Sequence, residues 1–219
     1  MKRIVCLLVA LVGTLSLAAQ TPQEILTRME QEMNGHESEG VFMALDAKVP
    51  VMGTMHSQSW MRGEKARMEM TMMGVTVINW YDETTEWEYN SKSNELTISL
   101  LEKKIKDPDK EVSSDRKSKE ESSELSMLGG LSEGYELAVT AETETHWVIT
   151  GKRLKTNDTK KAPKSFELTV SKVNFLPETF TAKISGVKMT MHDIRFGISE
   201  AQVTFNSADY PDATVIDKR

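Results

Sequence analysis

The sequence has one cysteine and four histidines in 219 residues, and both scarcities exclude a kind of site. A single cysteine cannot form an intrachain disulfide, and the histidines at positions 36, 56, 146 and 192 lack the spacing of a zinc site. We therefore expect no metal centre and no cofactor. Acidic residues outnumber basic residues by 33 to 27, giving a net charge of −6. That balance argues against nucleic acid as a partner, which requires clustered Lys and Arg.

Familiar catalytic signatures are also missing. The chain has no G-x-S-x-G nucleophile elbow, no P-loop and no dinucleotide-binding glycine motif. Its carboxylates are numerous, but those in alternating segments, such as Glu86 and Glu88, fit a solvated strand face. We expect no enzyme activity. A hydrolase with two carboxylates stays open as an alternative, because such a pair needs only spatial proximity.

Only the first residues contain a long hydrophobic run. Lys2 and Arg3 precede an apolar stretch over residues 4–17, and the small residues Ala18 and Ala19 follow. This order is typical of a secretory signal peptide, and the run is short for a membrane span, although a signal anchor is the alternative. We expect residues 1–19 to be the signal, cleaved near Ala18 or Ala19, and residues 20–219 to form a single domain.

Cleavage changes the composition of the mature chain. Cys6 leaves with the signal, so the mature chain has no cysteine, and loss of Lys2 and Arg3 moves the net charge from −6 to −8. A domain of this size can do without disulfides because its core is large enough. We expect a soluble protein exported to the periplasm.

A helix is expected at the start of the mature chain. Thr21 can cap it, Pro22 suits the first helical position, Glu24 completes a capping box, and Gly35 ends the pattern. Its apolar residues recur at helical spacing: Ile25, Leu26, Met29 and Met33. The helix therefore has one apolar face, which must lie on another part of the protein.

From Gly40 onward the hydrophobic period changes to two. Apolar and polar residues alternate through Met68-Met70-Met72, Trp87-Tyr89, Leu96-Ile98-Leu100, Tyr135-Leu137-Val139, Trp147-Ile149, Phe166-Leu168-Val170, Phe180-Ala182-Ile184 and Met189-Met191. Strands with one apolar face belong to antiparallel sheet. The fold class is therefore mainly β (α+β), with one strongly curved antiparallel sheet of about ten or eleven strands.

One segment departs from this alternation. Between Glu102 and Glu124, 15 of 23 residues are charged, which predicts a solvated loop, disordered over residues 107–123. Apolar residues follow at Leu125, Met127, Leu128 and Leu131. We expect the region of about residues 102–133 to be a charged loop that ends in a short helical lid over the open end of the sheet.

Methionine is unusually frequent, with 14 residues. Seven of them lie between Met52 and Met73, and three share one strand face. A barrel core padded with flexible side chains would explain each methionine singly. The cluster favours a hydrophobic ligand cavity instead, because the flexible thioether adapts to ligands of variable shape.

Three segments resemble the periplasmic outer-membrane lipoprotein carriers (LolA-like proteins). Trp60-Met61-Arg62 is similar to their W-V-K-R-P strand and turn, and residues 81–90 are similar to their D-G-K-T-L-W-x-Y-N hairpin. Residues 201–219 resemble their final strand and tail. This chain departs from the pattern in lacking proline after Arg62, in having Glu83 in place of glycine, and in its charged insert.

The resemblance implies an incomplete antiparallel β-barrel of about eleven strands with helices over its opening. It implies that acyl chains of lipoproteins bind non-covalently, and that the carrier, a monomer, takes them from an inner-membrane release complex to an outer-membrane receptor. A lipid-binding or sensor protein of the same fold is the alternative. The expected cavity residues are Met61, Met68, Met70, Met72, Trp87, Tyr89, Leu96, Ile98, Met189 and Met191.

Arg62 aligns with the arginine that holds the closed lid in that family through hydrogen bonds to the lid backbone. An ordinary exposed turn arginine is the alternative interpretation. Trp60, two residues earlier on the strand, is expected on the same face. With Arg62 and Trp60, the expected lid and release residues are Leu125, Met127 and Leu128. A filled barrel that serves only as an interaction module stays open beside the carrier.

Overall fold

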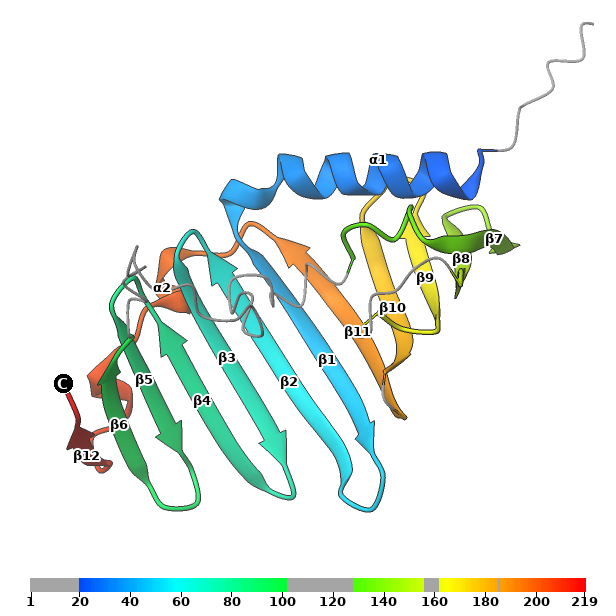
Figure 1. Ribbon diagram of the computed structural model, residues 1–219. Coiled ribbons are helices and arrows are strands. Elements are labelled where there is room, and N and C mark those ends of the chain that lie inside the picture. The colour runs from blue at the N-terminus through cyan, green and yellow to red at the C-terminus, as the bar shows by residue number, and fades with distance from the viewer. Residues whose placement is uncertain (1–19, 102–127, 156–161, 185) are drawn as a thin grey trace, which may run out of the picture.

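The computed structural model describes residues 20–101, 128–155, 162–184 and 186–219. Within these ranges the chain forms one twelve-stranded sheet, and helix α1 (Pro22–Gly35) lies across one end of it (Figure 1). The expected signal peptide and most of the expected loop and lid lie outside the described residues. The remaining prediction, a mainly β domain with an N-terminal helix, is confirmed.

The sheet is open rather than closed into a barrel. Its strand order is β12-β6-β5-β4-β3-β2-β1-β11-β10-β9-β8-β7, and β12 is parallel to β6. All other neighbours are antiparallel, as predicted. The strands are β1 (Val41–Val49), β2 (Gly53–Arg62), β3 (Lys65–Met72), β4 (Val75–Tyr81), β5 (Thr85–Asn90), β6 (Glu95–Leu100), β7 (Tyr135–Glu142), β8 (His146–Arg153), β9 (Ser165–Ser171), β10 (Pro177–Ile184), β11 (Val187–Phe196) and β12 (Thr214–Asp217).

Helix α1 begins where the sequence predicts. Thr21 Oγ1 accepts a hydrogen bond from Glu24 N at 3.2 Å, and Glu24 Oε2 accepts one from Thr21 N at 2.8 Å. This reciprocal capping box satisfies two backbone donors that the first helical turn leaves without partners. The helix ends at Gly35, and a 3-10 turn (η1, Glu37–Glu39) leads into β1.

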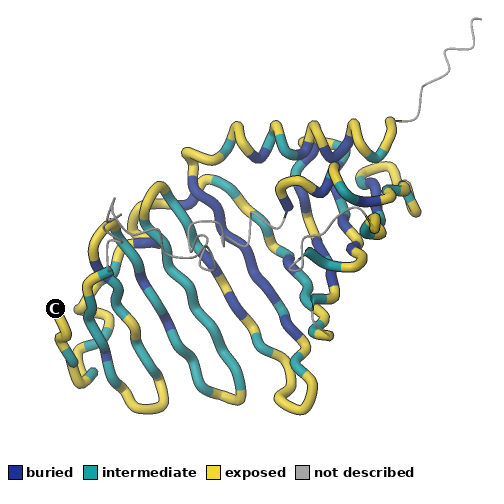
Figure 2. Tube along the Cα trace, in the orientation of Figure 1, coloured by how far each residue is buried: buried dark blue, intermediate teal, exposed yellow. Residues whose placement is uncertain are grey.

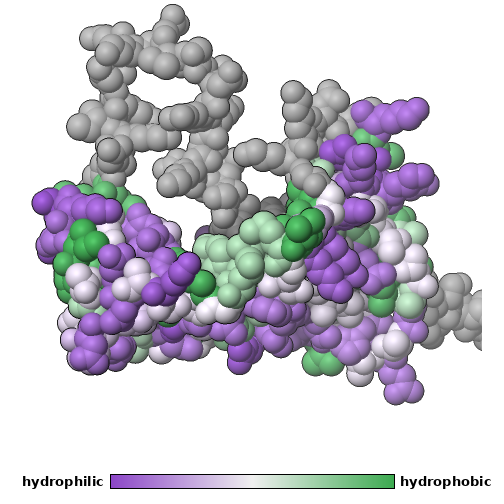
Figure 3. All heavy atoms as spheres, turned by 90° about the horizontal axis from the view of Figure 1, so that it is seen from below, coloured by the Kyte–Doolittle hydropathy of each residue, from purple (hydrophilic) through white to green (hydrophobic). Residues whose placement is uncertain are grey.

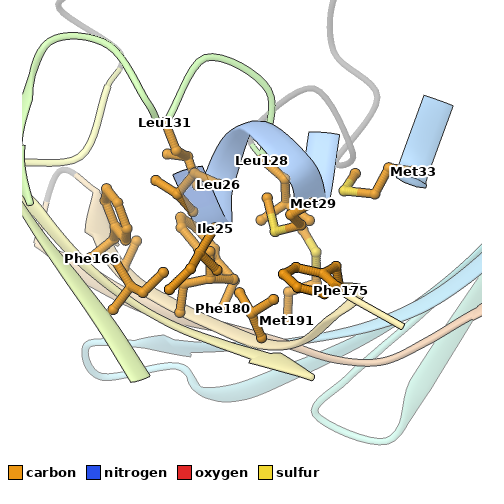
Figure 4. Packing of buried hydrophobic residues seen from close by; sticks show 14 of the residues in the cluster. Ile25, Leu26, Met29, Met33, Leu128, Leu131, Phe166, Phe175, Phe180 and Met191 are labelled. Atoms are coloured by element: carbon orange, nitrogen blue, oxygen red, sulfur yellow. The ribbon is translucent and has the colours of Figure 1, made fainter. Parts of the chain in front are cut away.

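The main core lies between α1 and one half of the sheet. The four apolar residues of α1 are buried against strands β1 and β8–β11, and Figure 4 shows several of these contacts close by. We call the sheet face that α1 covers the inner face; on β1 it carries Val41, Met43 and Leu45. Figure 2 shows β1 largely buried, whereas β3 and β4 are mostly half-buried.

The opposite, outer face of the sheet carries a second cluster. Phe42 and Ala44 of β1 contact Ile198 and Val203 there. Val203 belongs to α2 (Glu200–Val203), so the segment that resembles the family's final strand and tail begins with a helical turn. The reason is local: Ser199 N donates to Gln202 Oε1 at 2.8 Å, a capping pair that starts a helical turn. After a 3-10 turn (η4, Ser207–Asp209) the chain enters β12.

Candidate functional site

Methionines from four adjacent strands share the inner face. In β3, Met68 is opposite Ser59 and Met70 is opposite Ser57 of β2. Residues that are directly opposite each other in paired strands point to the same face of the sheet. Along a single strand, every second residue also points to that face. The pairing therefore groups eight methionines, which we call the methionine face: Met43, Met55, Met61, Met68, Met70, Met72, Met189 and Met191.

Burial divides the methionine face in two. Met43 and Met191 are fully buried beneath α1 and belong to the core. Met68, Met70 and Met72 are only half-buried, as are Val75 and Val77 opposite them on β4. Seen from the end opposite α1, moderately hydrophobic side chains gather in a hollow between the two ends of the sheet (Figure 3). The β3–β4 half of the inner face is therefore an apolar surface that the described residues bury only partly.

Two serines interrupt the apolar inner face. Ser57 and Ser59 are each 3% exposed. Among the described residues, the Ser57 hydroxyl has no hydrogen-bond partner. Buried hydroxyl groups almost always have a partner, so the Ser57 oxygen is an exception among the described residues.

The predicted cavity residues divide between the two faces of the sheet. Met61, Met68, Met70, Met72, Met189 and Met191 share the inner face. Trp87 is opposite Trp80 and Ile98, and Tyr89 is opposite Ile78 and Leu96, so Trp87, Tyr89, Leu96 and Ile98 lie on the outer face. The structure does not bring these four residues to the methionines, because the strand register turns their side chains toward the opposite face of the sheet.

On the outer face, the aromatic residues contact the C-terminal segment. Trp87 stacks on Phe205 with ring centroids 5.3 Å apart, and Tyr89 lies 4.5 Å from Tyr210. Trp80 contacts both Phe205 and Tyr210 edge to face. Aromatic pairs of this geometry contribute more to the stability of a fold than the burial of their apolar area alone. These residues attach the C-terminal segment to the sheet.

Arg62 joins two backbone segments at the end of the sheet beside α1. Its Nη1 donates to the Glu39 carbonyl oxygen at 2.8 Å and also to that of Ile198. The resemblance implies hydrogen bonds from this arginine to a lid backbone. The acceptors found here instead belong to the entry to β1 and to the segment after β11.

Glu200 and Lys65 complete the surroundings of Arg62. Glu200 Oε2 lies 3.9 Å from Arg62 Nε, and Lys65 Nζ hydrogen-bonds Glu200 Oε1. The hydrogen bond from Lys65 lowers the pKa of Glu200, and the same contact raises the pKa of Lys65. The pair therefore stays charged at neutral pH and holds α2 next to the start of β3.

Trp60 lies on the outer face with Arg62, as expected. Its ring centroid is 5.0 Å from that of Phe42, and the Arg67 guanidinium lies 4.5 Å over the Trp60 ring. Trp60 thus belongs to the packing of the outer face.

Of the predicted lid residues, only Leu128 lies within the described residues; Leu125 and Met127 lie outside them. Leu128 is fully buried in the main core together with Leu131 (Figure 4). Gly130 N donates to Glu30 Oε1 of α1 at 3.1 Å. The end of the predicted lid is therefore attached to α1.

Within the described ranges, no group of His, Cys, Asp and Glu residues has the arrangement of a metal site. The same ranges contain no helix that is long and apolar enough to cross a membrane.

Sequence reasoning missed Met43, Met55 and the two serines as neighbours of the predicted methionines. Met43 lies in the continuous apolar run of residues 41–45, so alternation could not assign it to a face. Along β2, Met55 shares its period with Ser57, Ser59 and Met61, which is a weak apolar signal. Only the strand register, with Met43 opposite Ser59 and Ser57 opposite Met70, puts these residues beside β3.

No protein-family model and no curated protein sequence matches this chain significantly. Solved structures do match. LprF from Mycobacterium bovis is 9% identical with a TM-score of 0.50, covering 81% of this chain and 93% of LprF. An uncharacterized conserved protein from Thermus thermophilus is 15% identical with a TM-score of 0.44, covering 91% of this chain and 100% of that one.

A LolA superfamily protein from Nitrosomonas europaea also matches, at 11% identity with a TM-score of 0.30, covering 87% of this chain and 100% of that protein. At these sequence identities, the likeness shows a similar fold and nothing more. The match to LprF, with its TM-score of 0.50, is the observation that supports it.

Proposed function

We propose that this protein is a periplasmic carrier that binds acyl chains on the methionine face. The observation that carries the proposal is the half-buried row Met68, Met70 and Met72, continued by Val75 and Val77. Moving a methylene group from water to an apolar surface contributes about 0.8 kcal/mol, so one chain gains several kcal/mol there. Flexible methionines accept such chains without imposing one shape.

The proposed cargo is the acylated end of a lipoprotein, taken from an inner-membrane release complex and passed to an outer-membrane receptor. The sequence motifs and the predicted export signal support this route. The proposed activity is non-covalent and requires no cofactor. A free lipid is the alternative cargo, and the Ser57 hydroxyl could accept a hydrogen bond from its polar group or donate one to it.

Binding is tested with a fluorescent fatty acid and the chain from residue 20 onward. We expect about one site per chain, and Met70→Gln should weaken binding by about tenfold, because an amide without a partner would face the acyl chain. Met73→Gln makes the same chemical change at an exposed turn residue and should leave binding unchanged. Equal affinities for both variants would contradict the proposal.

Arg62→Leu tests the proposed release function. Loss of the guanidinium leaves the carbonyl oxygens of Glu39 and Ile198 without their charged donor, so we expect the free energy of unfolding to fall by about 2 kcal/mol. If Arg62 also controls release, the variant should bind the fluorescent fatty acid but transfer it to acceptor vesicles more slowly. Arg62→Lys, which keeps the charge, should restore part of the stability. Transfer at the parent rate would remove Arg62 from the release step.

A further inference from the structure

Two hairpin turns at the end of the sheet opposite α1 expose apolar residues in an unusual backbone conformation. Val51, in the β1–β2 turn, has φ +69° and is 107% exposed. Met73, in the two-residue β3–β4 turn, has φ +52° and is 77% exposed. Both turns point away from α1 (Figure 1). We call Val51, Met73 and the exposed Met52 the tip residues.

These turn positions normally carry other residues. Met73 and Gly74 both have positive φ, the conformation of a hairpin turn that favours Asn-Gly. A β-branched residue such as Val51 is an outlier at positive φ, and such strain is held only where something offsets it.

Two other turns of the same chain show what usually offsets positive φ. Asn94, in the β5–β6 turn, has φ +52°, and asparagine tolerates that conformation. Phe175 has φ +57° but is only 8% exposed, and its ring lies 5.2 Å from that of Trp147. Packing thus accounts for Phe175. Val51 and Met73 project into solvent, so the described chain offers their side chains no comparable contact.

A row of lysines lies at the same end of the sheet. Lys48 of β1 is opposite Lys188 of β11, which is opposite Lys183 of β10. We call these three exposed residues the lysine row. Like charges directly opposite in a sheet are destabilising. The ion pairs among the described residues include none of the three.

The acidic residues near the lysine row are few. Lys48, Lys183 and Lys188 line a depression of about 440 Å³ together with Glu167. Asp46, the next acid along β1, is engaged by His56, whose Nδ1 lies 2.6 Å from Asp46 Oδ1. The lysine row therefore makes a local positive site on a chain whose net charge is −6.

We propose that this end of the sheet docks on an anionic membrane surface. The tip residues enter the boundary between headgroups and acyl chains, and the lysine row contacts lipid phosphates. Exposed apolar residues beside basic residues are how proteins that lie on a membrane bind it. Contact with the membrane then offsets both the unfavourable backbone conformation of the two turns and the repulsion between the paired lysines.

The charges favour a membrane over a second copy of the chain. A twofold contact between two such ends brings one lysine row near the other, and like charges oppose it. An anionic lipid surface complements the row along its whole length and also accepts apolar tips.

The apolar part of the proposal is tested by flotation with vesicles of phosphatidylcholine and phosphatidylglycerol, using the chain from residue 20 onward. In the double variant Val51→Asn/Met73→Asn, we expect vesicle binding to fall by about tenfold. The melting temperature should not fall, since asparagine suits both turns. Val173→Asn is the matched control, because Val173 is 84% exposed in the β9–β10 turn next to α1. Parental binding by the double variant overturns the proposal.

The charged part is tested on the same vesicles. Replacing the lysine row by glutamine should lower binding by about a hundredfold, since each lysine near an anionic surface contributes about fivefold. Binding to pure phosphatidylcholine should not change. The proposal is overturned if the parent binds equally well to vesicles with and without phosphatidylglycerol. It is also overturned if the parent self-associates and the Val51→Asn/Met73→Asn variant does not. Fatty-acid binding in solution should be the same in all these variants, which separates this proposal from the carrier function.

Discussion

Gly40→Ala is expected to lower the free energy of unfolding by about 3 kcal/mol, because two unfavourable effects combine at this residue. Gly40 has φ +75°, which disfavours a side chain. An added Cβ would also lie 2.8 Å from the Met61 carbonyl oxygen and 2.6 Å from Ile198 Cγ1. The backbone oxygen belongs to β2 and cannot move without shifting the strand that carries Arg62.

Chemical denaturation of the variant measures this effect, and Gly63→Ala is its control. Gly63 has φ +57°, but no atom lies within 4 Å of the added Cβ. The control therefore isolates the conformational part, about 1 kcal/mol. Equal losses in both variants would mean that the close approach of Gly40 to β2 has no energetic weight.

Phe180→Ala should be the most destabilising change in the core, at about 4 kcal/mol, because it empties a large buried volume. Phe180 is 2% exposed, and its ring centroid lies 5.7 Å from that of Phe166. Its strand neighbour Met191 is fully buried under α1. The cavity would thus open beneath the helix, and we expect α1 to lose protection in hydrogen exchange.

Phe205→Ala provides the comparison on the outer face. Phe205 is half-buried and contacts Trp80 and Trp87. We expect a loss of about 1–2 kcal/mol, from one aromatic cluster at the surface. A loss as large as that of Phe180→Ala would mean that the outer cluster contributes as much as the core under α1.

Local features of the fold were predictable because their causes are local. The capping box of Thr21 and Glu24 involves residues three apart, so the sequence contains both partners. Alternation identified eight of the twelve strands in the same way, since the side-chain period of a strand is two. The turn of α2 was not predicted, although Ser199 and Gln202 have capping-box spacing.

The candidate site was predictable only in part. Met68, Met70 and Met72 alternate, which indicates a shared face without saying which face of the sheet it is. Trp87 and Tyr89 alternate equally well, yet they lie on the opposite side. The face is decided by register: Ser57 is opposite Met70, and Asn79 is opposite both Met68 and Glu88. A shift of one residue would exchange the two faces.

The sequence by itself determined the elements of this protein: a capped amphipathic helix, strands with one apolar face, and an excess of methionine. These depend on residues within a few positions of one another. Only the tertiary structure decided that α1 covers one half of the inner face, that the C-terminal aromatics cover the outer face, and that Lys48, Lys188 and Lys183 form a row. Those arrangements depend on contacts between segments far apart in the chain, which packing and strand register select together.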